Sequence, residues 1–265
     1  MDLRRLARGS LDWTAVEGIA AELARRLGRP SIRVSFIEAQ NWSSIPFTVD
    51  DEYFVKVVTP QHALVHAILT GARNLGALTS GSPGFFERFD GPLEMAEHEL
   101  EAVRAIRALG INAPAPVEAF AHGDYGVVVM EYLPSFRPLD EVDLRAEPEL
   151  VDDLFRSLAT MHAGGVVHGD LRADNVLVDG GGLHFIDATL VREEWADDAR
   201  GYDLACAIAL VCPQVGPRVA VDVARRHFSV EDLLDARRFL DFVRVRPDHD
   251  FDVVQVRGEI EGRVA

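Results

Sequence analysis

The chain has 265 residues, of which 48% are hydrophobic and 26% charged, which is enough for one medium domain or for two lobes around a cleft. With 43 acidic and 27 basic residues the net charge is −16, so free nucleic acid is not expected as a partner. No run of residues is long and apolar enough for a membrane helix and no secretory signal is expected at the start, and Cys206 and Cys212 fit buried thiols of a cytoplasmic protein.

The cations are almost all arginine, because Lys56 is the only lysine in the chain. An acid-rich, lysine-poor composition suggests the hypothesis of a halophilic source, since molar salt shortens the screening length to about 3 Å and weakens surface repulsion. A GC-rich genome is the alternative for the missing lysines, but it does not explain the acid excess. A compact ammonium differs from a guanidinium in shape and hydration, so we predict that Lys56 is kept for a site.

The first 58 residues predict one helix followed by three strands. Thr14–Glu17 matches a capping box, and apolar residues then recur at helical spacing. Residues 31–38 alternate as a strand, and residues 47–58 predict two further strands around a turn at Asp50-Asp51. The last of these strands carries Lys56 among apolar residues, where an ammonium needs an anionic partner.

Residues 59–91 predict a helix and a loop rich in Ser, Gly and Pro. His62 and His66 lie four apart on that helix; a metal pair is one interpretation, and surface histidines are the favoured one. A strong helix is predicted from residue 93 to residue 109, with Glu99 and Glu97 on it. Two strands, 117–121 and 126–130, then lead into a short connection.

The second half begins with a helix whose apolar stripe ends at Met161, and a polar loop follows that contains Asp170. Asn175 stands five residues on, just before a predicted hairpin whose second strand ends at Asp187. Such a hairpin can place Asn175 and Asp187 side by side, and two oxygen ligands suit Mg²⁺, which takes the rest of its shell from water and phosphate. Asp170 is then left to face an incoming hydroxyl. Two amphipathic helices are expected within residues 216–243, and the tail from Arg246 is not assigned.

Three spaced motifs carry a resemblance to a known superfamily: His168-Gly169-Asp170, then Asn175, then Phe185-Ile186-Asp187. They resemble the catalytic and metal loops of protein-kinase-like proteins. Gly in place of Arg, and Ile-Asp in place of Asp-Phe-Gly, resemble the atypical branch. That branch includes RIO kinases, the KEOPS kinase, lipopolysaccharide-core kinases and aminoglycoside or choline phosphotransferases, and RIO-type kinases are the nearest in outline.

The resemblance implies an α+β, bilobal fold. Its N-lobe, residues 1–133, would hold a small antiparallel sheet, a glutamate-bearing helix and an insertion at about 59–91. Its C-lobe, residues 134–265, would be mostly helical. ATP would lie between the lobes, with Mg²⁺ bound by Asn175 and Asp187.

The resemblance also implies a role for each site residue. Lys56 would contact the inner phosphates and pair with Glu99, with Glu97 as the runner-up. Asp170 would take the acceptor proton, Arg172 would stabilise the moving phosphoryl group, and His168 would support the loop by hydrogen bonding. Backbone groups of Glu131 and Leu133 would bind adenine beside a Met130 gatekeeper, Ser43 and Ser44 would stand in for a glycine-rich phosphate loop, and Asp203 would tie down the catalytic loop or simply cap a helix.

Three functions remain open from the sequence. The first is a RIO-like serine/threonine protein kinase or ATPase, with a protein favoured over a metabolite as hydroxyl acceptor. The second is a small-molecule kinase of the aminoglycoside or choline type. The third is a nucleotide-binding pseudokinase scaffold, which the glycine-free loop favours and the intact Lys56, Asp170, Asn175 and Asp187 oppose. Control by activation-loop phosphorylation is not expected, because residues 188–202 are short and acidic.

Overall fold

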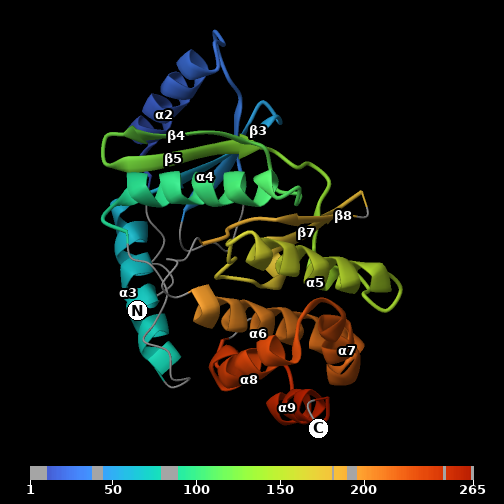
Figure 1. The fold of residues 1–265 in the computed structure, drawn as a ribbon. Helices are drawn as coiled ribbons and strands as arrows, with labels where there is room; N and C mark the ends of the chain where they lie inside the picture. Colours follow the sequence, from blue (N-terminus) through green and yellow to red (C-terminus); the bar gives the residue numbers. More distant parts are fainter. Residues whose placement is uncertain are drawn as a thin grey trace. The chain divides into compact units, whose positions relative to one another are not determined.

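The computed structural model describes residues 11–37, 44–78, 89–180, 182–189, 196–246 and 249–263. The chain divides into two compact units. The N-terminal unit comprises Met1–Thr70, Arg88–Arg104 and Pro114–Pro134, and the C-terminal unit comprises Gly71–Glu87, Ala105–Ala113 and Ser135–Ala265. One unit is built on an antiparallel sheet and the other is mostly helical, which confirms the predicted α+β, kinase-like class (Figure 1).

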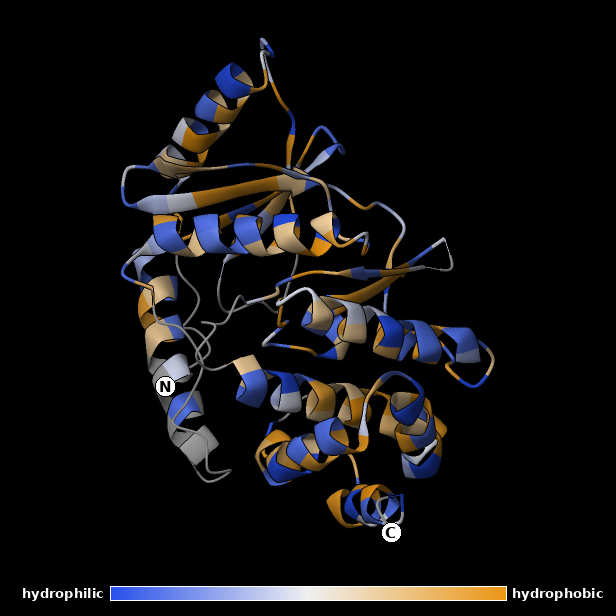
Figure 2. Ribbon diagram, viewed as in Figure 1, coloured by the Kyte–Doolittle hydropathy of each residue, from blue (hydrophilic) through white to orange (hydrophobic). Residues whose placement is uncertain are grey.

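The N-terminal unit contains a five-stranded antiparallel sheet in the order β1-β2-β3-β5-β4. Its strands are β1 (Val34–Phe36), β2 (Ile45–Val49), β3 (Tyr53–Val58), β4 (Pro116–His122) and β5 (Tyr125–Glu131). The strand β5, which has a neighbour on each side, is predominantly hydrophobic (Figure 2) and buried over most of its length.

The two faces of this sheet differ in chemistry because successive side chains of a strand point to opposite sides. One face packs against α2 (Trp13–Arg26). That core contains Ile19 and Leu23 of the helix and buried residues of four strands: Phe47, Val49, Val55, Val57, Phe120, Val127 and Val129. Lys56 lies between Val55 and Val57 in sequence, so it points to the other face, where α4 (Pro92–Ala108) carries Glu99.

The start of α2 corrects the predicted cap. The helix begins at Trp13, and the Asp12 side chain accepts a hydrogen bond from the Ala15 backbone N–H at 2.7 Å. The predicted capping box at Thr14 therefore lies inside the first turn. Asp12 is the N-cap because an aspartate caps a helix at least as well as a threonine. The extended backbone at Asp12 also directs its carboxylate at the unpaired amides of the first turn.

The C-terminal unit combines a small sheet, β6-β7-β8, with five α-helices among the residues that the structure describes. The strands are β6 (Arg137–Pro138), β7 (Val176–Asp179) and β8 (Gly182–Phe185). The helices are α5 (Pro148–Ala163), α6 (Ala196–Val215), α7 (Pro217–His227), α8 (Val230–Arg244) and α9 (Val253–Glu261), with 3₁₀ turns at Leu139–Glu141 and Ala173–Asn175.

The helix α6 forms the centre of this unit. Twelve of its residues are buried, so it has no continuous solvent-facing side and packs extensively against α8. Helices α7 and α8 are the two predicted in residues 216–243. The tail that the sequence left unassigned contains α9, whose N-cap is Asp252.

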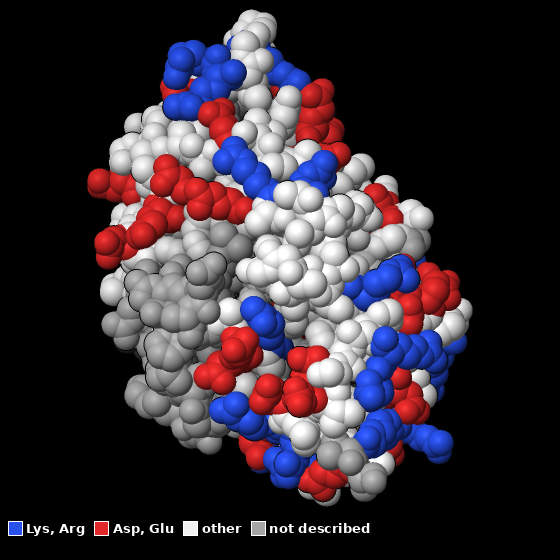
Figure 3. Space-filling model, viewed as in Figure 1, with Lys and Arg blue, Asp and Glu red and all other residues white. Residues whose placement is uncertain are grey.

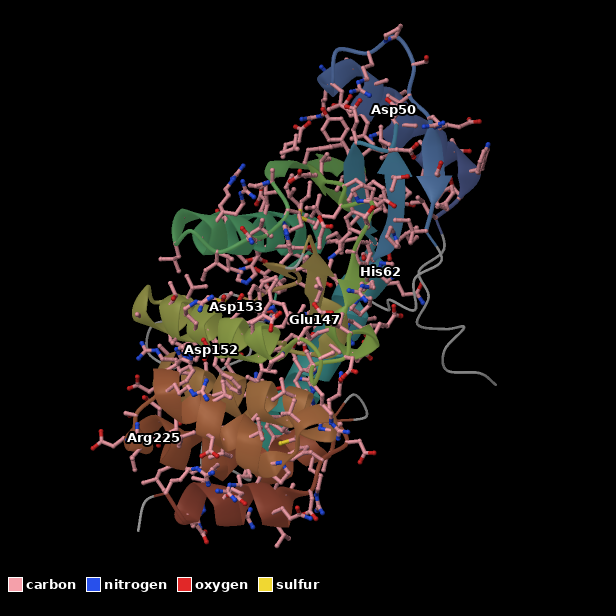
Figure 4. The ribbon with its side chains drawn as sticks, turned by 90° about the vertical axis from the view of Figure 1, so that its right-hand side faces the viewer. Asp50, His62, Glu147, Asp152, Asp153 and Arg225 are labelled. Carbon is pink, nitrogen blue, oxygen red and sulfur yellow. The ribbon has the colours of Figure 1, made fainter. Side chains whose placement is uncertain are left out.

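The helix α3 (Pro60–Leu78) corrects the interpretation of its histidines. His62, labelled in Figure 4, is 1% exposed and accepts a hydrogen bond from the Thr59 backbone N–H at its Nδ1, 3.2 Å away, so it is not a surface residue. Its burial lowers the pKa of the imidazole, which favours the neutral form. His66 packs its ring 5.1 Å from that of Phe89.

Two kinds of feature are absent from the described residues. No helix there is both long and apolar enough to cross a bilayer. No group of three or more His, Cys, Asp or Glu side chains there could enclose a metal. The absence of such a group does not test the predicted magnesium ligands Asn175 and Asp187, because that site was expected to use only two protein ligands.

Candidate functional site: the lysine–glutamate pair and the loop around Asp170

The only lysine of the chain is buried and paired. Lys56 is 3% exposed, and its Nζ donates to Glu99 Oε1 at 2.6 Å. Glu99 keeps an 18% exposed side chain, whereas Glu97 lies on an exposed part of the same helix. Lys56 therefore pairs with Glu99, which the sequence analysis preferred, and not with Glu97. A buried ammonium needs an anionic partner, and a carboxylate at this distance provides one.

The connection after β5 holds the residues predicted to bind adenine. Met130 is 2% exposed and lies opposite Phe54 of β3, while Lys56 lies opposite Val128, so Met130 and Lys56 share one face of the sheet. The Glu131 backbone N–H donates to the Ala115 carbonyl at 2.8 Å. The Glu131 amide is therefore already bonded within the protein. The adenine contacts that remain predicted are those of the Glu131 carbonyl and the Leu133 backbone.

Ser43, one of the two serines predicted to serve the phosphates, lies outside the described residues. Ser44 stands just before β2 and is 5% exposed. Among the residues that the structure describes, none offers its hydroxyl a hydrogen-bond partner.

The backbone of the loop before Asp170 is fixed by one buried carboxylate. Asp203 is fully buried in the middle of α6 and accepts the backbone N–H groups of His168 at 2.6 Å and Gly169 at 2.8 Å. Asp203 lies inside the helix, so the alternative of a simple N-cap is wrong. Hydrogen bonds to an ionised acceptor are stronger than neutral ones, and two of them fix the direction of the loop.

Gly169 stands where the common kinase motif has an arginine, and the backbone explains the difference. Its φ is +77°, which glycine adopts without strain, and an added Cβ would lie 3.0 Å from the Thr189 carbonyl oxygen. The Thr189 N–H also donates to the His168 carbonyl at 2.6 Å. The loop of Asp170 and the segment after Asp187 therefore run backbone against backbone.

His168 itself is fully buried beside the Phe185 ring, with ring centroids 6.2 Å apart. Burial is the main influence on its imidazole and lowers its pKa. Its backbone, rather than its ring, makes the hydrogen bonds described above, so the predicted supporting role of His168 falls to its main chain.

Asp170 contacts polar side chains from two regions of the described chain. Asn175 Nδ2 donates to the Asp170 carbonyl at 2.8 Å and lies 3.4 Å from its Oδ2. Arg172 Nε lies 3.7 Å from the same Oδ2, and its Nη1 lies 3.9 Å from Asp174. Arg246 Nη2 donates to Asp170 Oδ1 at 3.0 Å.

The hairpin β7–β8 brings Asn175 and the segment of Asp187 together. The strands pair Val176 with Phe185, and the Ile186 N–H donates to the Asn175 carbonyl at 3.0 Å. Asp187 follows directly with φ of +57°, a conformation that a short polar residue tolerates. Because Asn175 commits its amide nitrogen to Asp170, its side-chain oxygen is the atom left for a cation. An amide oxygen and a carboxylate are hard ligands of the kind that Mg²⁺ takes.

Sequence reasoning missed Arg246. It stands in the tail that was left unassigned, 76 residues from Asp170. No local pattern marks it, since 26 of the 27 basic residues are arginines and many of those form surface ion pairs. Both signs of charge are interspersed over the face of the molecule in Figure 3, which is why a single arginine does not stand out.

Comparison with known proteins gives one family and several partial relatives. Residues 92–198 match the model of the RIO domain, a segment that includes Glu99, Asp170, Asn175 and Asp187. A KEOPS complex subunit Bud32 from Pyrococcus abyssi is 27% identical over 114 residues, which cover 42% of this chain and 51% of the relative.

Two further relatives match shorter shares of their own length. A probable bifunctional tRNA threonylcarbamoyladenosine biosynthesis protein from Methanothermobacter thermautotrophicus is 30% identical over 115 residues, 43% of this chain and 21% of the relative. A probable serine/threonine-protein kinase from Dictyostelium discoideum is 39% identical over 54 residues, 20% of this chain and 10% of the relative. The chain thus spans about half the length of the first relative and a fifth of the second.

The antiparallel sheet with its lysine–glutamate pair and the loop and hairpin around Asp170 are those of a protein-kinase-like fold. The comparisons support a more particular likeness: residues 92–198 match the RIO domain, and the partial relatives agree with the predicted resemblance to the atypical, RIO-type branch.

Proposed function

We propose that this protein is an ATP-dependent phosphotransferase that uses Asp170 to accept the proton of a hydroxyl acceptor. The observation that carries the proposal is the geometry around Asp170: the preceding backbone is held by Asp203, the carboxylate lies beside Asn175, and Asp187 follows the paired strand. A nucleotide-binding module without transfer would not need a carboxylate held in this way.

In this proposal the N-terminal unit contributes the contacts to the nucleotide. Lys56, fixed by Glu99, binds the inner phosphates, and the Glu131 carbonyl and the backbone of Leu133 bind adenine next to Met130. The strongly acidic chain repels a polyanion, so a buried and oriented cation is needed to hold it. Ser44 is the described residue of the predicted phosphate loop.

The C-terminal unit contributes the chemistry. The Asn175 side-chain oxygen and Asp187 would hold Mg²⁺, which when bound neutralises charge on the phosphates. Asp170 orients the acceptor hydroxyl and takes its proton as the γ-phosphoryl group moves. Arg172, which contacts Asp170 and Asp174 in this structure, turns to the transferring phosphoryl group. Catalysis then rests mainly on positioning and charge stabilisation.

A protein is our preferred acceptor, and a serine or threonine hydroxyl is its reacting group. The names of two relatives support this, since one is a subunit of a complex and another is a probable serine/threonine-protein kinase. A small-molecule acceptor, or water in an ATPase, is the alternative, because the His-Gly-Asp motif fits all three.

The experiment compares wild type with Asp170→Ala for ATP binding and for release of phosphate with Mg²⁺, at low salt and at molar KCl. Asp174→Ala is the matched control, because Asp174 lies in the same loop with a 67% exposed side chain. We expect the Asp170 variant to bind ATP and to lose turnover by at least 100-fold, and the control to stay within a few-fold of wild type. Equal turnover in wild type and Asp170→Ala would contradict the proposal.

A purified protein mixture and an aminoglycoside or choline panel would then be offered as acceptors to the wild type. Phosphate transferred to protein supports the preferred acceptor, and phosphate transferred to a metabolite overturns it. Binding of ATP without any turnover in wild type favours the pseudokinase scaffold.

A further inference from the structure

A largely buried arginine, distant in sequence, contacts the proposed base. Arg246 stands two residues beyond the end of α8, and its backbone N–H still donates to the Val243 carbonyl at 3.0 Å. Its side chain is 10% exposed and that of Asp170 is 18% exposed, with 3.0 Å between Nη2 and Oδ1. Removing one partner of an ion pair so withdrawn from water costs more than removing one from a surface pair.

The guanidinium is itself held from α6. Its Nη1 donates to the Tyr202 hydroxyl, and Tyr202 is fully buried, with its ring centroid 6.2 Å from that of Phe239 and 5.5 Å from that of Phe242. Tyr202 precedes Asp203, the residue that binds the loop backbone. Two consecutive residues of α6 therefore fix this loop. Asp203 binds the loop backbone, and Tyr202 holds Arg246, which in turn binds the Asp170 carboxylate.

We propose that Arg246 is a positioning residue that sets the orientation of the Asp170 carboxylate for phosphoryl transfer. The inference rests on the proposed role of Asp170. With Oδ1 bound by Arg246, Oδ2 is the oxygen that faces Asn175 and Arg172, and in the proposed reaction it is the one that receives the acceptor proton. A carboxylate free to rotate about its last bond would spend part of its time misaligned, and phosphoryl transfer depends on positioning more than on the strength of the base. Arg246 lies beyond the segment that matches the RIO domain.

The test measures kcat and the ATP dissociation constant for Arg246→Ala, Arg246→Lys and Tyr202→Phe. Arg244→Ala is the matched control, because Arg244 is an exposed arginine at the end of the same helix. We expect Arg246→Ala to lower kcat by about 10- to 100-fold with ATP affinity changed less than about threefold, since the loss is of orientation and not of nucleotide contacts. Arg246→Lys should recover part of the loss, because an ammonium can donate to the same oxygen.

Tyr202→Phe keeps the packed ring and removes only the hydroxyl that holds Arg246, so kcat should fall in the same direction and by less. This variant carries the test if Arg246→Ala does not fold. An Arg246→Ala protein that melts like wild type and has an equal or higher kcat would overturn the inference, as would an unchanged kcat in Tyr202→Phe. Both results are distinct from failure of the proposed function, which would show as turnover retained in Asp170→Ala.

Discussion

Variants of the Lys56–Glu99 pair can distinguish a structural role of Lys56 from a functional one. Lys56→Met keeps most of the apolar stem and removes the ammonium, leaving Glu99 without its cation at 2.6 Å. Glu99→Gln does the reverse and leaves a buried ammonium beside a neutral amide. Lys56→Met/Glu99→Gln removes both charges together. Replacing a whole buried pair is often close to neutral, whereas removing one partner is not.

Ordinary protonation chemistry limits the size of each single effect. Neutralising a typical glutamate at pH 7 costs about 3.7 kcal/mol and a typical lysine about 4.6 kcal/mol, at about 1.36 kcal/mol per pH unit. The Glu99 side chain is 18% exposed and keeps some water, whereas the Lys56 side chain is 4% exposed. We therefore expect losses in the free energy of unfolding of about 2–3 kcal/mol for Lys56→Met and about 3–4 kcal/mol for Glu99→Gln.

The double variant should lose no more stability than the milder single variant, which requires a coupling free energy of at least about 3 kcal/mol. ATP turnover should be lost in Lys56→Met and should stay lost in the double variant, although stability returns. Urea unfolding followed by circular dichroism measures the first quantity and phosphate release the second. Glu22→Gln is the control, since Glu22 pairs with the exposed Arg25 on the same unit, and it should change little.

Additive stability losses would show that the two side chains do not act as a pair. Full turnover in either protein that lacks Lys56 would show that its ammonium is not the phosphate ligand. Recovery of both stability and turnover in the double variant would assign Lys56 a purely structural role.

Three further predictions concern the framework around these groups. Asp203→Ala leaves two buried loop amides without their acceptor and should lower the unfolding free energy, measured by urea titration, by about 3–5 kcal/mol. Most turnover should be lost as well. Stability within error of wild type would show that Asp203 does not hold the loop. Gly126→Ala should destabilise by more than about 1–2 kcal/mol, because the new Cβ would lie 2.0 Å from the Pro92 carbonyl oxygen, whereas Gly258→Ala on the open side of α9 should stabilise by about 0.5 kcal/mol. Burial raises the pKa of the Cys206 and Cys212 thiols to about 12, so iodoacetamide at pH 8.5 should modify neither in the folded protein and both in urea, with mass spectrometry as the readout.

The local pattern of the sequence was sufficient for most elements of the fold. Strands of alternating residues, the helix that bears Glu99 and the hairpin after Asn175 all depend on side chains a few positions apart, and such spacing is written directly in the chain. The motif around Asp170 was also readable, because each of its residues keeps a fixed distance in sequence from the next.

The sequence was less informative about which of two neighbouring residues caps a helix and about which polar side chains are buried. Asp12 and Thr14 both offer a cap, and only the path of the backbone chose Asp12. The sequence favoured a surface His62, and the packing of α3 buried it. The predicted domain boundary at residue 133 stays a prediction, while the compact units draw on segments from several parts of the chain.

The sequence by itself determined most of the helices and strands, and which of them bear the residues predicted to carry chemistry. Tertiary structure alone decided what surrounds them: that Asp203 lies inside α6 and accepts two amides of a loop 34 and 35 residues away, and that Arg246 reaches Asp170 across 76 residues. The reason is physical. A helix or a hairpin forms from near neighbours, but a buried charge finds its partner only when the whole core closes around it, and many of this chain's arginines could have been that partner.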